Sequence, residues 1–148
     1  MRRTTASIVA IALASMMGVA AASDWRQLGI AAPAQTSRGA KVTGIEEIDA
    51  SSVVAVGGHV DAWLRDTYPE DVFDGPALPV YRYDLTLYRY DCADRHFLVL
   101  QVSCYDSSGQ QVYTANNDAL RTPGQAVVPD SIGEHAFNAA CSIARSKK

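Results

Sequence analysis

The chain has 148 residues, of which 48% are hydrophobic and 20% charged, with 13 basic residues against 16 acidic ones. Such a composition is typical of one globular domain and not of a polytopic membrane protein. The formal net charge of −3 and an isoelectric point near 5.5 exclude a basic nucleic-acid-binding protein, so no nucleic-acid partner is expected.

Residues 1–22 have the pattern of a cleavable signal peptide. Arg2 and Arg3 precede a short apolar stretch, and an A-x-A signal ends at Ala22. The apolar stretch from Ile8 to Ala22 is 15 residues long, whereas a membrane-spanning helix needs about 20, which argues against an N-terminal anchor. We therefore expect cleavage after Ala22, no transmembrane segment in the mature chain, and a location in the periplasm or at the cell surface.

Three cysteines, Cys92, Cys104 and Cys141, lie in the expected mature chain. Thiols that can pair in an oxidising compartment usually do so, and an odd number leaves one over. One structural disulfide with one buried thiol is the plain interpretation, and a reactive or intermolecular cysteine is the alternative. The spacing contains no C-x-x-C motif and no Cys/His cluster typical of zinc, so no metal site is expected.

The first half of the mature chain predicts short strands after an irregular start. Glycine and proline in residues 23–41 predict an irregular lead-in, with a short strand at its beginning over 24–28. The predicted α+β domain then covers 42–145. Its first strands are expected at 42–48, 53–56 and 59–68, followed by a loop over 70–79. The pair Glu46 and Glu47 indicates that 42–48 is an exposed edge strand, and Trp63 interrupts the alternation of apolar and polar residues in 59–68.

The clearest β-region covers residues 80–116. Strands are predicted at 80–90, 96–105 and 110–115, and the turns at 91–94 and 106–109 are short enough for an antiparallel meander. The even positions of the middle strand carry its apolar face, which predicts burial of Leu98, Leu100, Val102 and Cys104.

A polar loop over 116–125 precedes a predicted C-terminal helix from Ser131 to Arg145. Ser131 and Glu134 have the spacing of a capping box. The fold class is therefore α+β, a small, mainly antiparallel sheet of five or six strands with this helix packed on one face. We expect the helix residues Ile132, Phe137 and Cys141 to pack on the strand face that carries Leu98, Leu100 and Val102.

The sequence contains no recognisable catalytic or cofactor motif. Nucleophile elbows, zinc-protease motifs, phosphate-binding glycine loops and EF-hand loops are all missing, so we predict a non-enzymatic protein without a cofactor. His59 follows two glycines and His96 begins a strand, and neither has a partner at metal-ligand spacing. A small-ligand carrier, for instance of haem with His59 or His96 as ligand, is the third functional hypothesis.

Tyrosine and arginine are concentrated in one predicted strand. Both residue types are favoured in protein–protein interfaces because they bury a large area while keeping a polar tip in solvent. The alternative is that tyrosine simply suits a strand. The candidate protein-binding residues are Tyr81, Arg82, Tyr83, Tyr88, Arg89 and Tyr90.

Several short motifs, in order along the chain, resemble the surface-adhesin protein E family of bacterial exported proteins. They include Asp24-Trp25, Ile48-Asp49-Ala50-Ser51-Ser52, Val60-Asp61-Ala62-Trp63, Tyr90-Asp91-Cys92, Tyr105-Asp106-Ser107-Ser108-Gly109, Val128-Pro129-Asp130-Ser131 and the late Cys141. The resemblance implies a protein E-like domain over 42–145 and a Cys92–Cys141 disulfide, with Cys104 left as a buried thiol. If Leu85 and Leu87 faced the helix, strict alternation would place Cys92 on the other face, and a bulge or the turn at Asp91 would have to reverse it.

The resemblance also implies an envelope or cell-surface role, with host matrix or envelope proteins as partners. A homodimer is a further candidate assembly. Because no cysteine stands near the expected cleavage site, a lipid anchor is not expected. A soluble periplasmic housekeeping or inhibitor module is therefore the second functional hypothesis.

Overall fold

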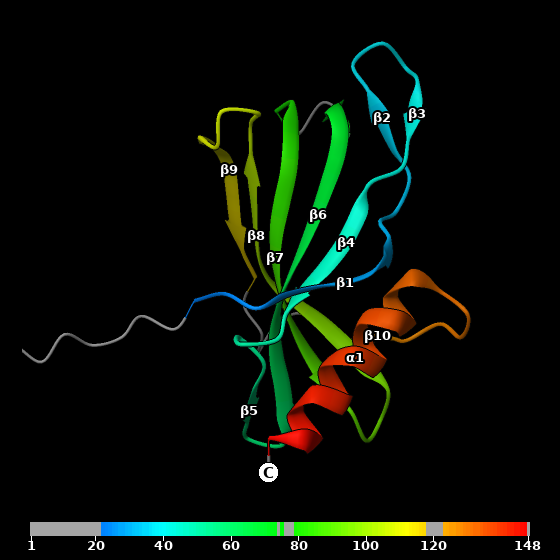
Figure 1. The fold of residues 1–148 in the computed structure, drawn as a ribbon. Helices are drawn as coiled ribbons and strands as arrows, with labels where there is room; N and C mark the ends of the chain where they lie inside the picture. The colour runs from blue at the N-terminus through cyan, green and yellow to red at the C-terminus, as the bar shows by residue number, and fades with distance from the viewer. Residues whose placement is uncertain (1–21, 74, 76–78, 118–122, 148) are drawn as a thin grey trace, which may run out of the picture.

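The computed structural model describes residues 22–73, 75, 79–117 and 123–147. The signal peptide expected over 1–22 lies outside these residues except for Ala22, and so do parts of the loops expected over 70–79 and 116–125. The described chain forms an open antiparallel sheet with one C-terminal helix packed against it (Figure 1), which confirms the predicted fold class.

Ten strands and one helix follow one another along the described chain. They are β1 (Trp25–Ile30), β2 (Ala34–Thr36), β3 (Lys41–Val42), β4 (Ile45–Asp49), β5 (Val54–Val56), β6 (His59–Phe73), β7 (Tyr81–Asp91), β8 (His96–Tyr105), β9 (Gln111–Asn116), β10 (Gln125–Ala126) and α1 (Ile132–Ser146).

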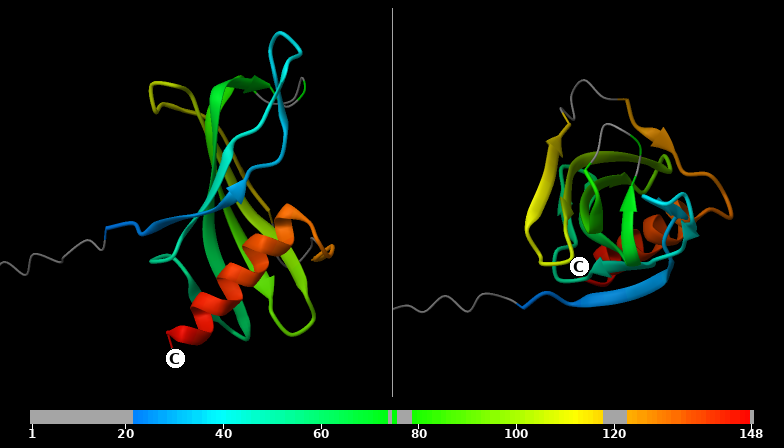
Figure 2. Two further views of the ribbon diagram at one scale, coloured as in Figure 1. Left: turned by 45° about the vertical axis from the view of Figure 1, so that its right-hand side comes forward. Right: turned by 90° about the horizontal axis from the view of Figure 1, so that it is seen from above.

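The path across the sheet is six strands wide, in the order β1-β4-β6-β7-β8-β10. The other strands lie off this path, because several short strands pair with different parts of one long strand. The 15-residue β6 makes this possible, because β5, β4 and β2 pair with successive parts of it while β7 pairs along nearly its whole length. The strands curl around a common axis, and the β2–β3 hairpin projects beyond the end of the sheet remote from α1 (Figure 2). The larger strand number thus comes from subdivision of a sheet whose width matches the prediction.

Three boundaries differ from the sequence prediction. The lead-in 23–41 also contains β2, which pairs with β6, while the strand expected over 24–28 is present as β1 and reaches Ile30 because it pairs with β4. For the same reason β4 is an interior strand, and the expected edge at 42–48 is wrong. The third difference is at Pro69, after which β6 continues to Phe73, because a register shift between Thr67 and Val72 accommodates residues that do not pair with β7.

The helix begins as predicted and packs on the sheet through a different set of residues. The Ser131 hydroxyl accepts the Glu134 backbone N–H at 3.2 Å, and the Glu134 carboxylate accepts the Asp130 N–H at 2.8 Å. Behind this cap the helix face contacts a core of strand residues, namely Ile48, Val60, Ala62, Leu64 and Tyr90. We call the sheet face that carries these residues the inner face and the opposite one the outer face.

The expected packing of α1 on Leu98, Leu100 and Val102 is wrong. A register shift places Leu87 opposite Gln101 but Tyr88 opposite Val99, so Leu100 is the extra residue of a β-bulge. Beyond the bulge the alternation is reversed, and Phe97 takes the inner position that even numbering assigned to Leu98. Val102 belongs instead to a second cluster, which lies around Tyr68, Val72, Tyr81 and Cys104.

The structure contains the disulfide between Cys92 and Cys141. The even positions Tyr88 and Tyr90 face the helix, so Cys92 continues on the same side, and no reversal of the kind needed with Leu85 and Leu87 facing the helix occurs. Cys104 is buried at 2% exposure in the second cluster and takes no part in this disulfide.

Candidate functional site

The predicted protein-binding strand is divided between the two faces of the sheet. Tyr81 and Tyr90 are 6% and 2% exposed and belong to the two cores. Tyr88 packs against the core contacted by α1, which we call the helix-side core. Burial, with a smaller effect of nearby carboxylates, raises the pKa of its phenol. These three side chains are therefore directed into the protein, while Tyr83 lies on the outer face beside Tyr105.

The two arginines of the predicted surface are held by carboxylates on β6. Arg89 makes a bidentate pair with Asp61 at 2.8 and 2.7 Å, and Arg82 donates to Asp71 at 2.9 Å. In Arg89 the hydrogen bond to Asp61 raises the pKa of the guanidinium, against a smaller opposing effect of burial. Both guanidiniums thus have a partner within the chain.

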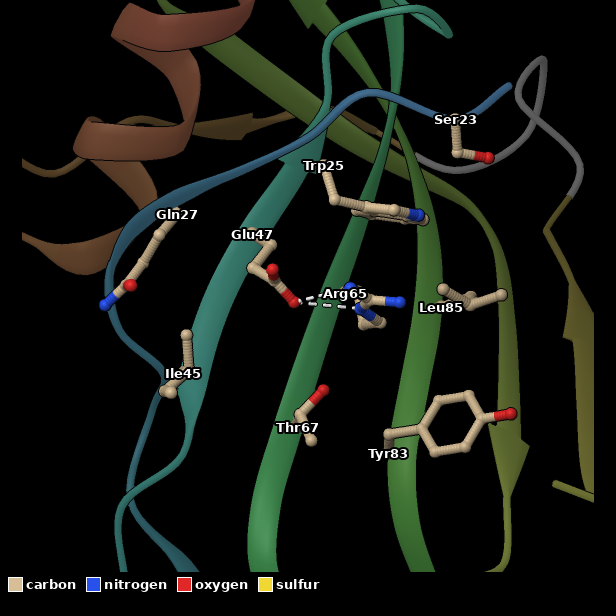
Figure 3. Close-up of a pocket in the computed structure, with 9 residues that line it drawn as sticks. All are labelled: Ser23, Trp25, Gln27, Ile45, Glu47, Arg65, Thr67, Tyr83 and Leu85. Carbon is tan, nitrogen blue, oxygen red and sulfur yellow. Dashed lines mark hydrogen bonds and ion pairs between the residues drawn. The ribbon is translucent and has the colours of Figure 1, made fainter. Parts of the chain in front are cut away.

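A groove on the outer face brings together residues that are far apart in sequence (Figure 3). It consists of two adjoining hollows, of about 640 and 390 Å³, which share Ser23, Trp25 and Leu85. We call this feature the outer groove. Its remaining lining residues are Gln27, Ile45, Glu47, Arg65, Thr67 and Tyr83 in the larger hollow and Asp49, Trp63, Gln101, Ser103, Tyr105 and Gln111 in the smaller one.

A fixed stack of Trp25, Arg65 and Glu47 lines the larger hollow of the outer groove. The guanidinium carbon of Arg65 lies 4.3 Å from the Trp25 ring centre, which is a cation–π contact. The same guanidinium donates to Glu47 at 2.9 Å from Nε and forms an ion pair at 2.8 Å through Nη2. Figure 3 shows the indole above the arginine, which the carboxylate holds in place. The orientation of the Trp25 ring is therefore determined before any ligand arrives.

The other aromatic platform is made by Tyr83 and Tyr105 on adjacent strands. These residues are opposite one another in the β7–β8 register, and their rings stack with centres 4.8 Å apart and planes 4° from parallel. Trp63 lines the same hollow as Tyr105. Both tryptophans of the chain thus lie in the outer groove.

The sequence contains one signal for this groove, at Trp63. Trp63 interrupted the alternation because it stands on the polar side of its strand, between the inward Ala62 and Leu64. A large aromatic side chain on the polar face of a strand indicates a use other than core packing. Trp25 and Tyr105 carried no such signal, because their proximity depends on strand pairing across the sheet.

The inner face carries a row of three carboxyl groups, which we call the acid row. Glu46, Asp66 and Asp84 lie directly opposite one another on β4, β6 and β7. Burial, with the nearby charges of Asp66 and Asp84, raises the pKa of Glu46 to about 8, and burial raises the pKa of Asp66 to about 6. Glu46 is 7% exposed, and Asp66 Oδ1 is buried without a hydrogen-bond partner among the described residues.

His59 and His96 are the first residues of β6 and β8, and His135 lies in α1. His59 Nδ1 is 3.8 Å from Asp91 Oδ2, and His96 Nδ1 lies 2.7 Å from the Asp94 carbonyl oxygen. Within the described ranges no group of three histidine, cysteine or acidic residues has a geometry that could hold a metal ion. The only helix in the described part of the chain is too short and too polar to cross a membrane.

An open antiparallel sheet with a disulfide-linked helix on one face and an aromatic groove on the other defines a small domain of the α+β class. The family model described as Surface-adhesin protein E matches residues 37–142, which is 106 of the 148 residues, and the chain belongs to this family. The comparisons with curated proteins and with solved structures gave no match. The resemblance found in the sequence motifs is thereby confirmed, and the protein is surface-adhesin-like.

Proposed function

We propose that this protein is exported to the cell envelope or surface and binds host matrix or envelope proteins through the outer groove. The observation that carries the proposal is the concentration of both tryptophans and the Tyr83–Tyr105 stack in the two adjoining hollows of the outer groove. Family membership supports an adhesive role, and binding rather than catalysis.

The chemistry of the groove suits protein recognition. Tryptophan, tyrosine and arginine dominate the binding energy of protein interfaces because they bury large areas in well-packed sites. Trp25 and Arg65 are already ordered by their mutual contact and by Glu47, so less conformational freedom is lost on binding. Of the six residues first expected to bind a partner, Tyr83 is the one that lines the groove.

Export is supported by two independent features. Residues 1–22 have the charge and apolar pattern of a signal peptide. The Cys92–Cys141 disulfide belongs to an oxidising compartment, since thiols in the cytosol are kept reduced.

Binding is tested with purified protein and immobilised matrix glycoproteins such as fibronectin. We expect the double variant Trp25→Ala/Tyr83→Ala to weaken attachment by at least about tenfold, because two hot-spot rings are removed. Tyr113→Ala is the control. It removes a tyrosine ring that packs against the second cluster, around Tyr68 and Tyr81, and not in the outer groove. Equal affinity of the folded groove variant and the parent would refute the outer groove as the binding site.

Localisation separates the surface protein from the periplasmic alternative. Protease added to intact cells should degrade an epitope-tagged chain that is displayed on the surface. Protection until the outer membrane is opened would instead support the periplasmic housekeeping or inhibitor module.

A further inference from the structure

We propose that the occupant of the outer groove is a neutral oligosaccharide, carried as a glycan by the glycoprotein partner. This inference rests on the proposed function, because it names the chemical class that the same groove recognises.

The rings provide flat platforms of the size of a pyranose face. Tyr83 and Tyr105 are parallel in their stack, with planes 4° apart, so each ring covers one face of the other and leaves the opposite face uncovered by it. The Trp25 indole is fixed over Arg65. The face of an aromatic ring carries partial negative charge, so it attracts the polarised C–H groups on the apolar face of a sugar. Hollows of about 640 and 390 Å³ fall within the range of small-ligand sites.

The polar groups around these rings have spare hydrogen-bonding capacity. Within the described part of the chain, the Gln27 and Gln111 amides and the Tyr105 hydroxyl make no side-chain hydrogen bond, while Gln101 and Ser103 are bonded to each other at 3.3 Å. An amide side chain offers donors and an acceptor together, and a sugar hydroxyl needs both. A proline-rich peptide would stack on the same rings, but its prolines have carbonyl acceptors and no N–H donors. A sugar hydroxyl can both donate to and accept from the glutamine amides, so these amides favour the sugar.

The only cation among the described lining residues is paired and Asp49 stays ionised, which argues against an anionic ligand. Arg65 is paired with Glu47, and Asp49 accepts hydrogen bonds from the Asp24 N–H and from Ser51. Among the residues that the structure describes, no other charged one lines the two hollows. A sulfated or sialylated glycan needs an unpaired cation, which these lining residues do not offer, whereas a neutral glycan needs none.

The two tryptophans make occupancy of the groove directly observable. Because Trp25 and Trp63 are the only tryptophans of the chain, intrinsic fluorescence reports on the groove alone. The first probes are chitotetraose and cellotetraose, neutral sugars with flat equatorial faces, titrated to about 5 mM with a proline decamer in parallel. We expect at least one sugar to give a saturable change in fluorescence, and the decamer to give none.

Two groove variants and one control refine the test. Tyr83→Ala should weaken the sugar affinity by at least about tenfold, and Gln101→Ala by a smaller factor. Gln125→Ala, which changes an exposed amide on β10 outside the groove, should leave the affinity unchanged. Saturable binding of the decamer in place of the sugars, or no response to either sugar, would overturn the inference.

A second measurement keeps the inference distinct from the proposed function. Attachment to the immobilised glycoprotein is measured before and after enzymatic removal of its glycans. Loss of attachment after deglycosylation supports the glycan as ligand. Attachment that persists, yet remains sensitive to Trp25→Ala/Tyr83→Ala, would leave the protein-binding function standing and refute the sugar.

Discussion

Glu46→Gln is expected to stabilise the protein, and to do so increasingly as the pH rises. Glu46 is 7% exposed and lies opposite Asp66, which in turn lies opposite Asp84. Burial and these two neighbours raise its pKa to about 8, from 4.5 for the exposed group. Because the folded-state pKa is the higher one, the stability contributed by the protonated carboxyl is complete below about pH 4.5 and is lost as the pH rises through about 8.

The magnitude follows from the same shift. Each unit of pKa difference corresponds to about 1.4 kcal/mol, so the parent should lose on the order of 3 kcal/mol between about pH 5 and pH 8 through this residue. Asp49, Asp91, Asp106 and Glu134 have lowered pKa values, so their stabilisation is lost only as the pH falls, below this window. A glutamine cannot ionise, and its amide can donate to the neighbouring carboxylates of the acid row.

Urea unfolding of the disulfide-intact protein, measured across this pH range, checks the prediction. The free energy of unfolding of Glu46→Gln should diverge from that of the parent towards alkaline pH. Glu47→Gln is the matched control on the same strand, since Glu47 faces the outer groove and pairs with Arg65. Parallel pH profiles of the parent and Glu46→Gln would refute the argument that the acid row destabilises the ionised protein.

Three further changes test the packing. Replacing Cys92 and Cys141 by serine removes a disulfide across a sequence separation of 49 residues. In the chain-entropy model this should lower the free energy of unfolding, measured in urea, by about 4 kcal/mol. Non-reducing peptide mapping of the parent should recover no bridge to Cys104. Phe137→Ala should cost about 3–5 kcal/mol in the same assay, because the ring is 3% exposed and makes an edge contact with Tyr90 at 5.9 Å; a loss below about 1 kcal/mol would contradict its core position. Gly44→Ala should lower the thermal midpoint strongly, since the added Cβ would lie 2.4 Å from the Thr67 carbonyl oxygen, whereas the control Gly29→Ala meets nothing within 4 Å.

Features that depend on neighbouring residues were predictable from the sequence. The capping box placed the start of α1 because Ser131 and Glu134 satisfy backbone groups only a few residues away. The short turns likewise implied the antiparallel meander of β7, β8 and β9. The disulfide came from the family resemblance, and the cysteine spacing by itself left the pairing open.

Features that depend on strand register were not predictable in the same way. Alternation identifies two faces only while the register is unbroken, and the bulge at Leu100 exchanges them within one strand. The expected burial of Leu98 and the expected helix contact failed for this reason. The outer groove was missed because Trp25 and Tyr83 come together only once β1 has paired with β4.

The acid row and the apolar core act on the same register in opposite directions. Ionised side chains opposite one another on β4, β6 and β7 disfavour the native pairing, whereas apolar pairs such as Ile48 with Leu64 stabilise it. The helix and the disulfide reinforce only the part of the sheet that carries the helix-side core.

The part of the sheet around Tyr68 and Tyr81 should therefore open first when the acid row ionises. Amide hydrogen exchange, corrected for the intrinsic pH dependence, should show a lower opening free energy there at about pH 8 than at about pH 6, with a smaller change next to α1. Glu46→Gln should reduce the difference between the two parts. A uniform loss of protection over both parts, in the parent and the variant alike, would mean that the sheet opens as one unit and that the acid row has no local effect.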